Sequence, residues 1–158
     1  MTSTIPETMT NTDRIEKKVV LRAPLSRVWQ AIADAKQFSE WFGVKLEQTF
    51  KAGQKVKGKI LNPSYEHIQF EMEIERIEPQ RYFSYRWHPY AVDPKADYSK
   101  EPTTLVEFVL EEVKEGTALT ITESGFDRIP ASRRAEAFRM NDSGWAGQAK
   151  RIAGYVEK

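Results

Sequence analysis

A long amphipathic stretch, residues 131–156, constrains the fold more than any other feature of the sequence. Pro130 stands at its entrance, a position that proline favours, and a helix of this length would span about 39 Å. Steps of four and three residues place one stripe of side chains on a single helix face. The stripe consists of Ala131, Ala135, Phe138, Asp142, Trp145, Ala149, Ile152 and Val156. Because Gly144, Gly147 and Gly154 weaken intrinsic helicity, this helix needs an apolar surface to pack against.

Most of the remaining chain alternates between apolar and polar residues, a pattern that predicts strands. The expected strands cover residues 14–22, 44–50, 55–61, 65–77, 81–88, 103–113 and 117–125. Helical spacing between residues 24 and 42 breaks at Asp34, which predicts two short helices after the first strand. In the strand over 65–77 the alternation fails at Ile77, so we expect a bulge near Glu75.

This order of elements predicts an α+β fold. An antiparallel sheet of seven strands cannot leave its apolar face in water, and only the long C-terminal helix is large enough to cover it. We therefore expect a single domain, residues 14–158, in which the sheet wraps around that helix. Residues 1–13 are rich in threonine and lack the features of a secretory signal, so we expect a flexible tail and a cytoplasmic protein.

Composition excludes several kinds of site. The sequence has no cysteine, which rules out disulfides and thiolate chemistry. Its 24 basic and 23 acidic residues give no net attraction to nucleic acid or to an anionic membrane. The basic strand face of Lys51, Lys55, Lys57 and Lys59 is expected to lie beside the acidic face of Glu71, Glu73 and Glu75. His67 and His88 fall on different expected strands, and no motif indicates a metal ion, phosphate or other cofactor.

Three motifs resemble one family. They are the segment 23–32 followed by Trp41, the segment 116–126, and the pair Gly144-Trp145. Together they are similar to the Bet v 1-like or START-like superfamily, also called SRPBCC, and within it to the branch related to the activator of Hsp90 ATPase, termed AHSA1-like. The resemblance implies a helix-grip fold with a cavity between sheet and helix. It also implies binding or processing of hydrophobic small molecules. Where family helices often carry leucine, this sequence has Ala149, which could widen the cavity.

The candidate ligand site combines the aromatic strand residues with the helix stripe. Its expected cavity residues are Trp41, Phe70, Met72, Tyr85, Trp87, Phe108, Glu123, Phe138, Asp142, Trp145 and Ala149. The connection over residues 89–102 is long and contains three prolines, and such loops often serve function. We expect it to form an entrance or lid in which Tyr90 and Tyr98 cover apolar surface.

Two carboxylates in the expected interior leave two interpretations open. Glu123 is in phase with Leu119 and Ile121, and Asp142 interrupts the helix stripe. Either both reach solvent, or both orient a ligand in an apolar pocket, because a buried carboxylate needs a partner. Arg86 and Arg139 are the partners considered.

The sequence supports three functions in decreasing order. The first is binding of a hydrophobic small molecule in the cavity between sheet and helix. The second is a cyclase- or hydrolase-like enzyme of the same superfamily, whose catalytic residues the sequence does not identify. The third is an Hsp90-associated co-chaperone. It is the least favoured, because 158 residues leave no room for the second domain of the eukaryotic activator.

Overall fold

The computed structural model describes residues 12–46, 48–65 and 67–158. Its elements in chain order are β1 (Arg14–Leu21), α2 (Leu25–Ala33), α3 (Ala35–Phe42), β2 (Val44–Leu46), β3 (Lys55–Ile60), β4 (Gln69–Glu78), β5 (Tyr82–Trp87), β6 (Thr104–Val113), β7 (Gly116–Ser124), η1 (Phe126–Arg128) and α4 (Ala131–Val156). The predicted tail falls mostly outside the described residues. Within them, Asp13 accepts hydrogen bonds from the backbone N–H groups of Gly125, Phe126 and Asp127.

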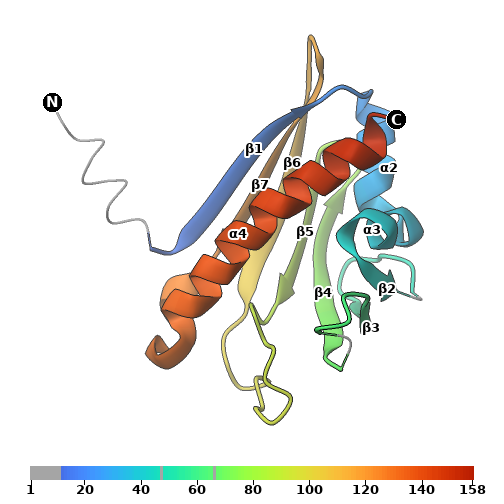
Figure 1. Cartoon of the computed structure of the whole chain (residues 1–158). Coiled ribbons are helices and arrows are strands. Elements are labelled where there is room, and N and C mark those ends of the chain that lie inside the picture. Colours follow the sequence, from blue (N-terminus) through green and yellow to red (C-terminus); the bar gives the residue numbers. More distant parts are fainter. Residues whose placement is uncertain (1–11, 47, 66) are drawn as a thin grey trace, which may run out of the picture.

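One antiparallel sheet and one long helix dominate the architecture. The seven strands run in the order β1-β7-β6-β5-β4-β3-β2, and each pairs antiparallel with its neighbour. Helix α4 crosses one face of this sheet, and its C-terminal end lies near α2 and α3 (Figure 1). The predicted α+β helix-grip fold, with its two short helices after the first strand, is confirmed.

The sheet face under α4 forms the core. Phe70, Met72 and Ile74 point inward from β4, and Phe83 and Tyr85 do so from β5. A register shift between Ile74 and Arg76 confirms the expected bulge. It places Tyr85 opposite Ile74 and Ser84 opposite Arg76.

Local turn chemistry explains the ends of several elements. Asp34 accepts a hydrogen bond from the backbone N–H of Gln37 and so caps α3. Gly43 ends α3 in the left-handed conformation, which glycine adopts without steric cost. On the outer side of the sheet Lys55 lies opposite Glu73 and Lys57 opposite Glu71, as expected for facing strands of opposite charge.

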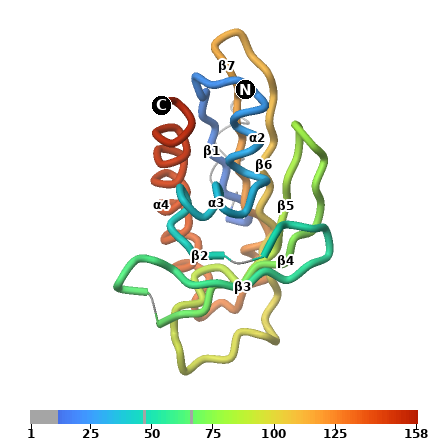
Figure 2. Tube along the Cα trace, turned by 90° about the vertical axis from the view of Figure 1, so that its right-hand side faces the viewer, coloured from blue at the N-terminus to red at the C-terminus, as the bar shows by residue number. Residues whose placement is uncertain are grey.

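Two strands are shorter than the sequence indicates. Strand β2 ends at Leu46 rather than at residue 50, and β4 begins at Gln69 rather than at residue 65. Residues 61–68 instead form a connection with turns at Asn62 and Tyr65. This connection and the loop over residues 88–103 hang from the same end of the sheet, below α4 (Figure 2).

Helix α4 has the predicted bounds, but it is rotated relative to the predicted stripe. Its buried residues are Ala137, Trp145, Ile152 and Val156. Ala131 and Ala135 are exposed and Phe138 is only half-buried, because the first turns of α4 pack beside η1. There the Phe138 ring meets Phe126 with centroids 5.1 Å apart.

Candidate ligand cavity

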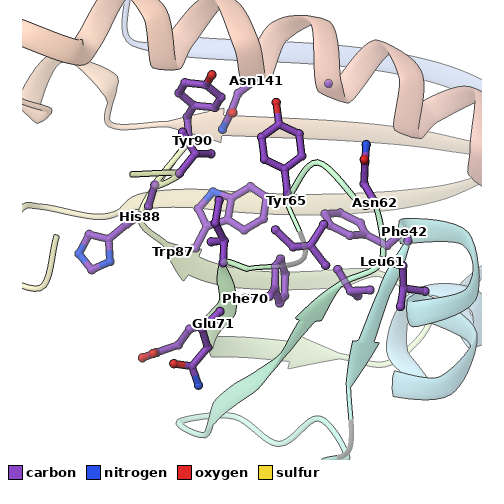
Figure 3. A pocket seen from close by; sticks show the side chains of 18 of the residues that line it. Phe42, Leu61, Asn62, Tyr65, Phe70, Glu71, Trp87, His88, Tyr90 and Asn141 are labelled. Atoms are coloured by element: carbon purple, nitrogen blue, oxygen red, sulfur yellow. The ribbon is translucent and has the colours of Figure 1, made fainter. Parts of the chain in front are cut away.

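A cavity of about 1190 Å³ lies between α4, the adjoining ends of β4 and β5, and two loops (Figure 3). Its floor is formed by Phe70 and Trp87. Its sides come from the corner between α3 and β2, from the connection over residues 61–68 and from the loop over 88–103. Tyr65 rises from the first of these connections and points toward α4. The cavity is partly open to solvent between the two loops.

Four aromatic side chains line the inner end of the cavity, and we call them the aromatic wall: Phe42, Phe70, Trp87 and Trp145. Trp87 is central, with ring centroids 5.9 Å from Phe70, 6.1 Å from Phe42 and 5.9 Å from Trp145. Most of these contacts are edge-to-face, the arrangement that aromatic quadrupoles favour. The wall offers a continuous apolar surface to anything that enters.

One face of α4 closes the cavity from above. It carries Asn141, Gly144, Trp145, Gln148 and Arg151, which follow helical spacing. Gln148 Nε2 donates to the carbonyl of Phe42 at 3.0 Å, and Arg151 Nε donates to the carbonyl of Trp41 at 2.7 Å. These bonds fasten the helix to the end of α3.

Glu123 lies directly behind the aromatic wall and is fully buried. Its Oε2 accepts hydrogen bonds from Trp87 Nε1 at 2.7 Å and from Thr104 Oγ1 at 2.6 Å. Its Oε1 accepts from Trp145 Nε1 at 2.8 Å and from Asn141 Nδ2 at 2.9 Å. The carboxylate is therefore saturated by side-chain donors from β5, β6 and α4. It does not line the cavity itself.

The structure separates the two carboxylates that the sequence placed in one interior. Asp142 is half-exposed and forms an ion pair with Lys17 of β1, with Nζ and Oδ1 2.9 Å apart. The predicted place of Asp142 in the cavity is wrong, because the neighbouring residue Asn141 faces Glu123 instead. The suggested partner Arg86 is bonded to Glu75 on the outer side of the sheet.

The loop over residues 88–103 is held against α4 by Arg133. Arg133 Nη2 and Nε donate to the Glu101 carboxylate at 2.7 and 2.9 Å, and Nη1 donates to the carbonyl of Pro89 at 2.7 Å. Its guanidinium also lies over the ring of Tyr98, 4.7 Å from the centroid. Tyr90 and Tyr98, the predicted lid residues, both line the cavity. Sequence analysis missed Arg133, since nothing local marks an arginine that binds a distant loop.

The remaining candidates lie elsewhere. Trp41, Met72, Tyr85 and Phe108 belong to the buried core and not to the cavity lining. Phe138 packs on η1, and the cavity lining does not include Ala149. Phe42, Asn141 and Gln148 line the cavity without having been predicted.

Titratable groups at the cavity are few and dispersed. His67, His88 and Glu71 line it, and His88 Nε2 donates to the carbonyl of Glu101 at 3.1 Å. Within the described residues there is no group of three or more His, Asp or Glu side chains arranged to hold a metal ion. Deeper in the core, burial raises the pKa of the Tyr85 hydroxyl well above its ordinary value, and the charge of Glu123 adds to this.

The fold and the cavity define a helix-grip protein, in which a sheet holds a long helix and leaves a space between them. Residues 22–157 match the family model described as activator of Hsp90 ATPase homolog 1-like protein, and the chain belongs to that family. No curated protein matches the sequence. In the part of the chain that the structure describes, no helix combines the length and apolarity needed to cross a bilayer.

Solved structures share the fold. DynU16, a protein of the dynemicin biosynthetic locus, is 25% identical with a TM-score of 0.70; the match covers 92% of this chain and 48% of DynU16, about half its length. Protein MLL2253 from Mesorhizobium loti is 19% identical with a TM-score of 0.71, covering 90% of this chain and 96% of that one. The Aha1 dimer from Colwellia psychrerythraea is 15% identical with a TM-score of 0.68, covering 91% and 96%.

Proposed function

We propose that this protein binds a hydrophobic small molecule in the cavity between the sheet and α4. The observation that carries the proposal is the aromatic wall at the inner end of a space of about 1190 Å³. Natural ligand pockets are concave, mostly apolar and of roughly 300–1,000 Å³, with a few polar groups near the mouth. This cavity has that character, since its charged side chains, such as Lys55, Glu71 and Asp93, come from strand ends and loops.

We further propose that the loop over residues 88–103 is the lid of this cavity. It contributes Tyr90, Val92 and Tyr98 to the lining. Hydrogen bonds from Arg133 hold both ends of the loop, at Pro89 and at Glu101. Opening the lid would break these bonds without disturbing the sheet, so ligand exchange can occur in a folded protein.

A cyclase- or hydrolase-like enzyme remains the alternative. Its acid or base would have to be a group that reaches the ligand, such as His67, His88 or Glu71. Glu123 does not suit this role, because four donor groups saturate it behind the wall. An Hsp90-type partner is supported by the family description alone, and we give it the lowest rank. A cytoplasmic location is part of the proposal.

The glycines of α4 offer a matched test of the cavity. A side chain at Gly144 would enter the cavity lining, whereas Gly147 lies outside it, and a Cβ at either position meets no atom within 4 Å. Both Gly144→Leu and Gly147→Leu should raise helix stability by up to about 1 kcal/mol. A neutral naphthylamine fluorophore is titrated into each variant and the wild type.

We expect saturable binding to the wild type and to Gly147→Leu. Binding to Gly144→Leu should be weaker by about tenfold or more, roughly 1.4 kcal/mol. The loss would occur in a protein that is no less stable than the wild type, so it would report on occupied space alone. Absence of binding to the wild type, or equal binding to both variants, would refute the proposed site.

A further inference from the structure

We propose that Glu123 is the positioning residue of the aromatic wall. It fixes the two tryptophans of the wall and binds their polar atoms, so that the inner end of the cavity presents only carbon to a ligand. The consequence for binding rests on the proposed function of the cavity. The positioning itself rests only on contacts within the protein.

The contacts of Glu123 converge from three elements besides its own strand. Trp87 ends β5, Thr104 begins β6, and Asn141 and Trp145 lie four residues apart on α4. Glu123 on β7 therefore joins the strands of the cavity floor to the helix above it. Each of the two indole N–H groups is bonded to a different oxygen of the carboxylate, at 2.7 and 2.8 Å.

A carboxylate suits this position because it only accepts hydrogen bonds. All four partners are donors, and two oxygens offer about four lone-pair sites. Bonds to an ionised acceptor are shorter and stronger than neutral ones, in agreement with the distances of 2.6–2.9 Å. Among the described residues no cation forms an ion pair with Glu123, so these donors stabilise its buried charge.

The same bonds determine the chemistry of the wall. An indole is apolar except at its N–H group, and here both N–H groups point at Glu123 and away from the cavity space. Both N–H contacts of Asn141 are also directed at the carboxylate, at 2.9 and 3.2 Å. The wall therefore has no free indole donor, which favours the apolar end of a ligand there. Loss of the acceptor would release these donors and let the rings turn.

The decisive variant is Glu123→Gln, which keeps the shape but replaces one acceptor oxygen with a donor NH₂ group. The readout is the set of four indole N–H signals in ¹⁵N-resolved NMR spectra, from Trp29, Trp41, Trp87 and Trp145. We expect the signals of Trp87 and Trp145 to move upfield and to exchange faster with solvent. The signal of Trp41, whose Nε1 donates to the carbonyl of Ala31 at 2.8 Å, should not change.

Binding of the neutral fluorophore separates positioning from general stability. The control is Leu119→Ala, a truncation of a fully buried core residue outside the cavity lining. We expect Glu123→Gln to weaken binding about tenfold and Leu119→Ala to leave the affinity unchanged, although both lower stability. Equal weakening in both variants would overturn the proposal, because Glu123 would then act only through the stability of the fold.

A second variant decides the matter if Glu123→Gln does not fold. Thr104→Val removes the other donor on the oxygen that Trp87 uses and keeps the size of the side chain. The bond from Trp87 should then shorten, moving its indole signal downfield more than that of Trp145. Unchanged signals in either variant would overturn the proposal. If the wild type binds no fluorophore, the proposed function fails, while the indole signals still test the positioning.

Discussion

Lys17 of β1 pairs with Asp142 of α4 across the edge of the sheet, with Nζ and Oδ1 2.9 Å apart. The Asp142 side chain remains 48% exposed. The polar interruption of the helix stripe is thus a surface ion pair that ties α4 to the first strand. It does not belong to the cavity, which is one residue away at Asn141.

Asp142→Asn should therefore change little. Exposed ion pairs contribute about 0–1 kcal/mol, and salt screens them. We expect urea unfolding to show a loss within this range that disappears at 1 M salt, together with unchanged fluorophore affinity. Weaker binding by the variant would mean that Asp142 acts on the cavity after all.

Trp145→Ala should be among the most damaging single changes. The side chain is buried, packs against Trp87 and Phe108, and donates to Glu123. Large aromatic truncations in cores cost about 3–5 kcal/mol, and here a buried acceptor also loses a partner. Equilibrium urea denaturation measures this loss. An unchanged midpoint would contradict the packing described here.

Arg133→Met tests the lid. The variant removes hydrogen bonds from a charged donor to Glu101 and Pro89, each worth about 1.5–3 kcal/mol. We expect the loop to open more often, so that stopped-flow association and dissociation of the fluorophore both accelerate by roughly tenfold or more. Arg139→Met changes an exposed arginine of the same helix and is the control. Equal rates in the two variants would show that the loop is not a lid.

Tyr85→Phe tests the core beneath the wall. The Tyr85 hydroxyl is buried without a hydrogen-bond partner, so its removal should leave stability at pH 7 unchanged or raise it by about 1 kcal/mol.

The pH dependence of Tyr85 has a definite sign. Because burial raises its pKa in the folded state above the ordinary value of 10.0, the unfolded chain releases this proton first as pH rises. Wild-type stability should then fall above pH 10 more steeply than that of Tyr85→Phe, by about 1.4 kcal/mol per pH unit. Urea unfolding at pH 9, 10 and 11 measures the difference. Parallel curves would contradict it.

Much of the fold follows from local patterns in the sequence. The apolar spacing, with Pro130 at the entrance, predicts the bounds of α4, and the alternation in β4 identifies Phe70, Met72 and Ile74 as core. The failure of that alternation at Ile77 locates the bulge. Such features are readable because each depends on residues a few positions apart.

The cavity was only partly predictable. Phe70, Trp87 and Trp145 were expected to lie near a ligand and do line the cavity, as do Tyr90 and Tyr98 of the loop. Their role in binding stays a prediction. The contribution of residues 61–68 was missed, because the end of a predicted strand proved to be a connection that turns back over the cavity.

The sequence by itself determined which segments become strands and helices, and that one long helix must cover one sheet. Only the tertiary structure decided which carboxylate is internal. One residue along a helix is a rotation of about 100°, so the choice between Asn141 and Asp142 depends on how α4 turns about its own axis when it packs. That rotation is set by contacts with β5, β6 and β7, far away in the sequence. The same contacts make Glu123 an internal acceptor and place Lys17 beside Asp142.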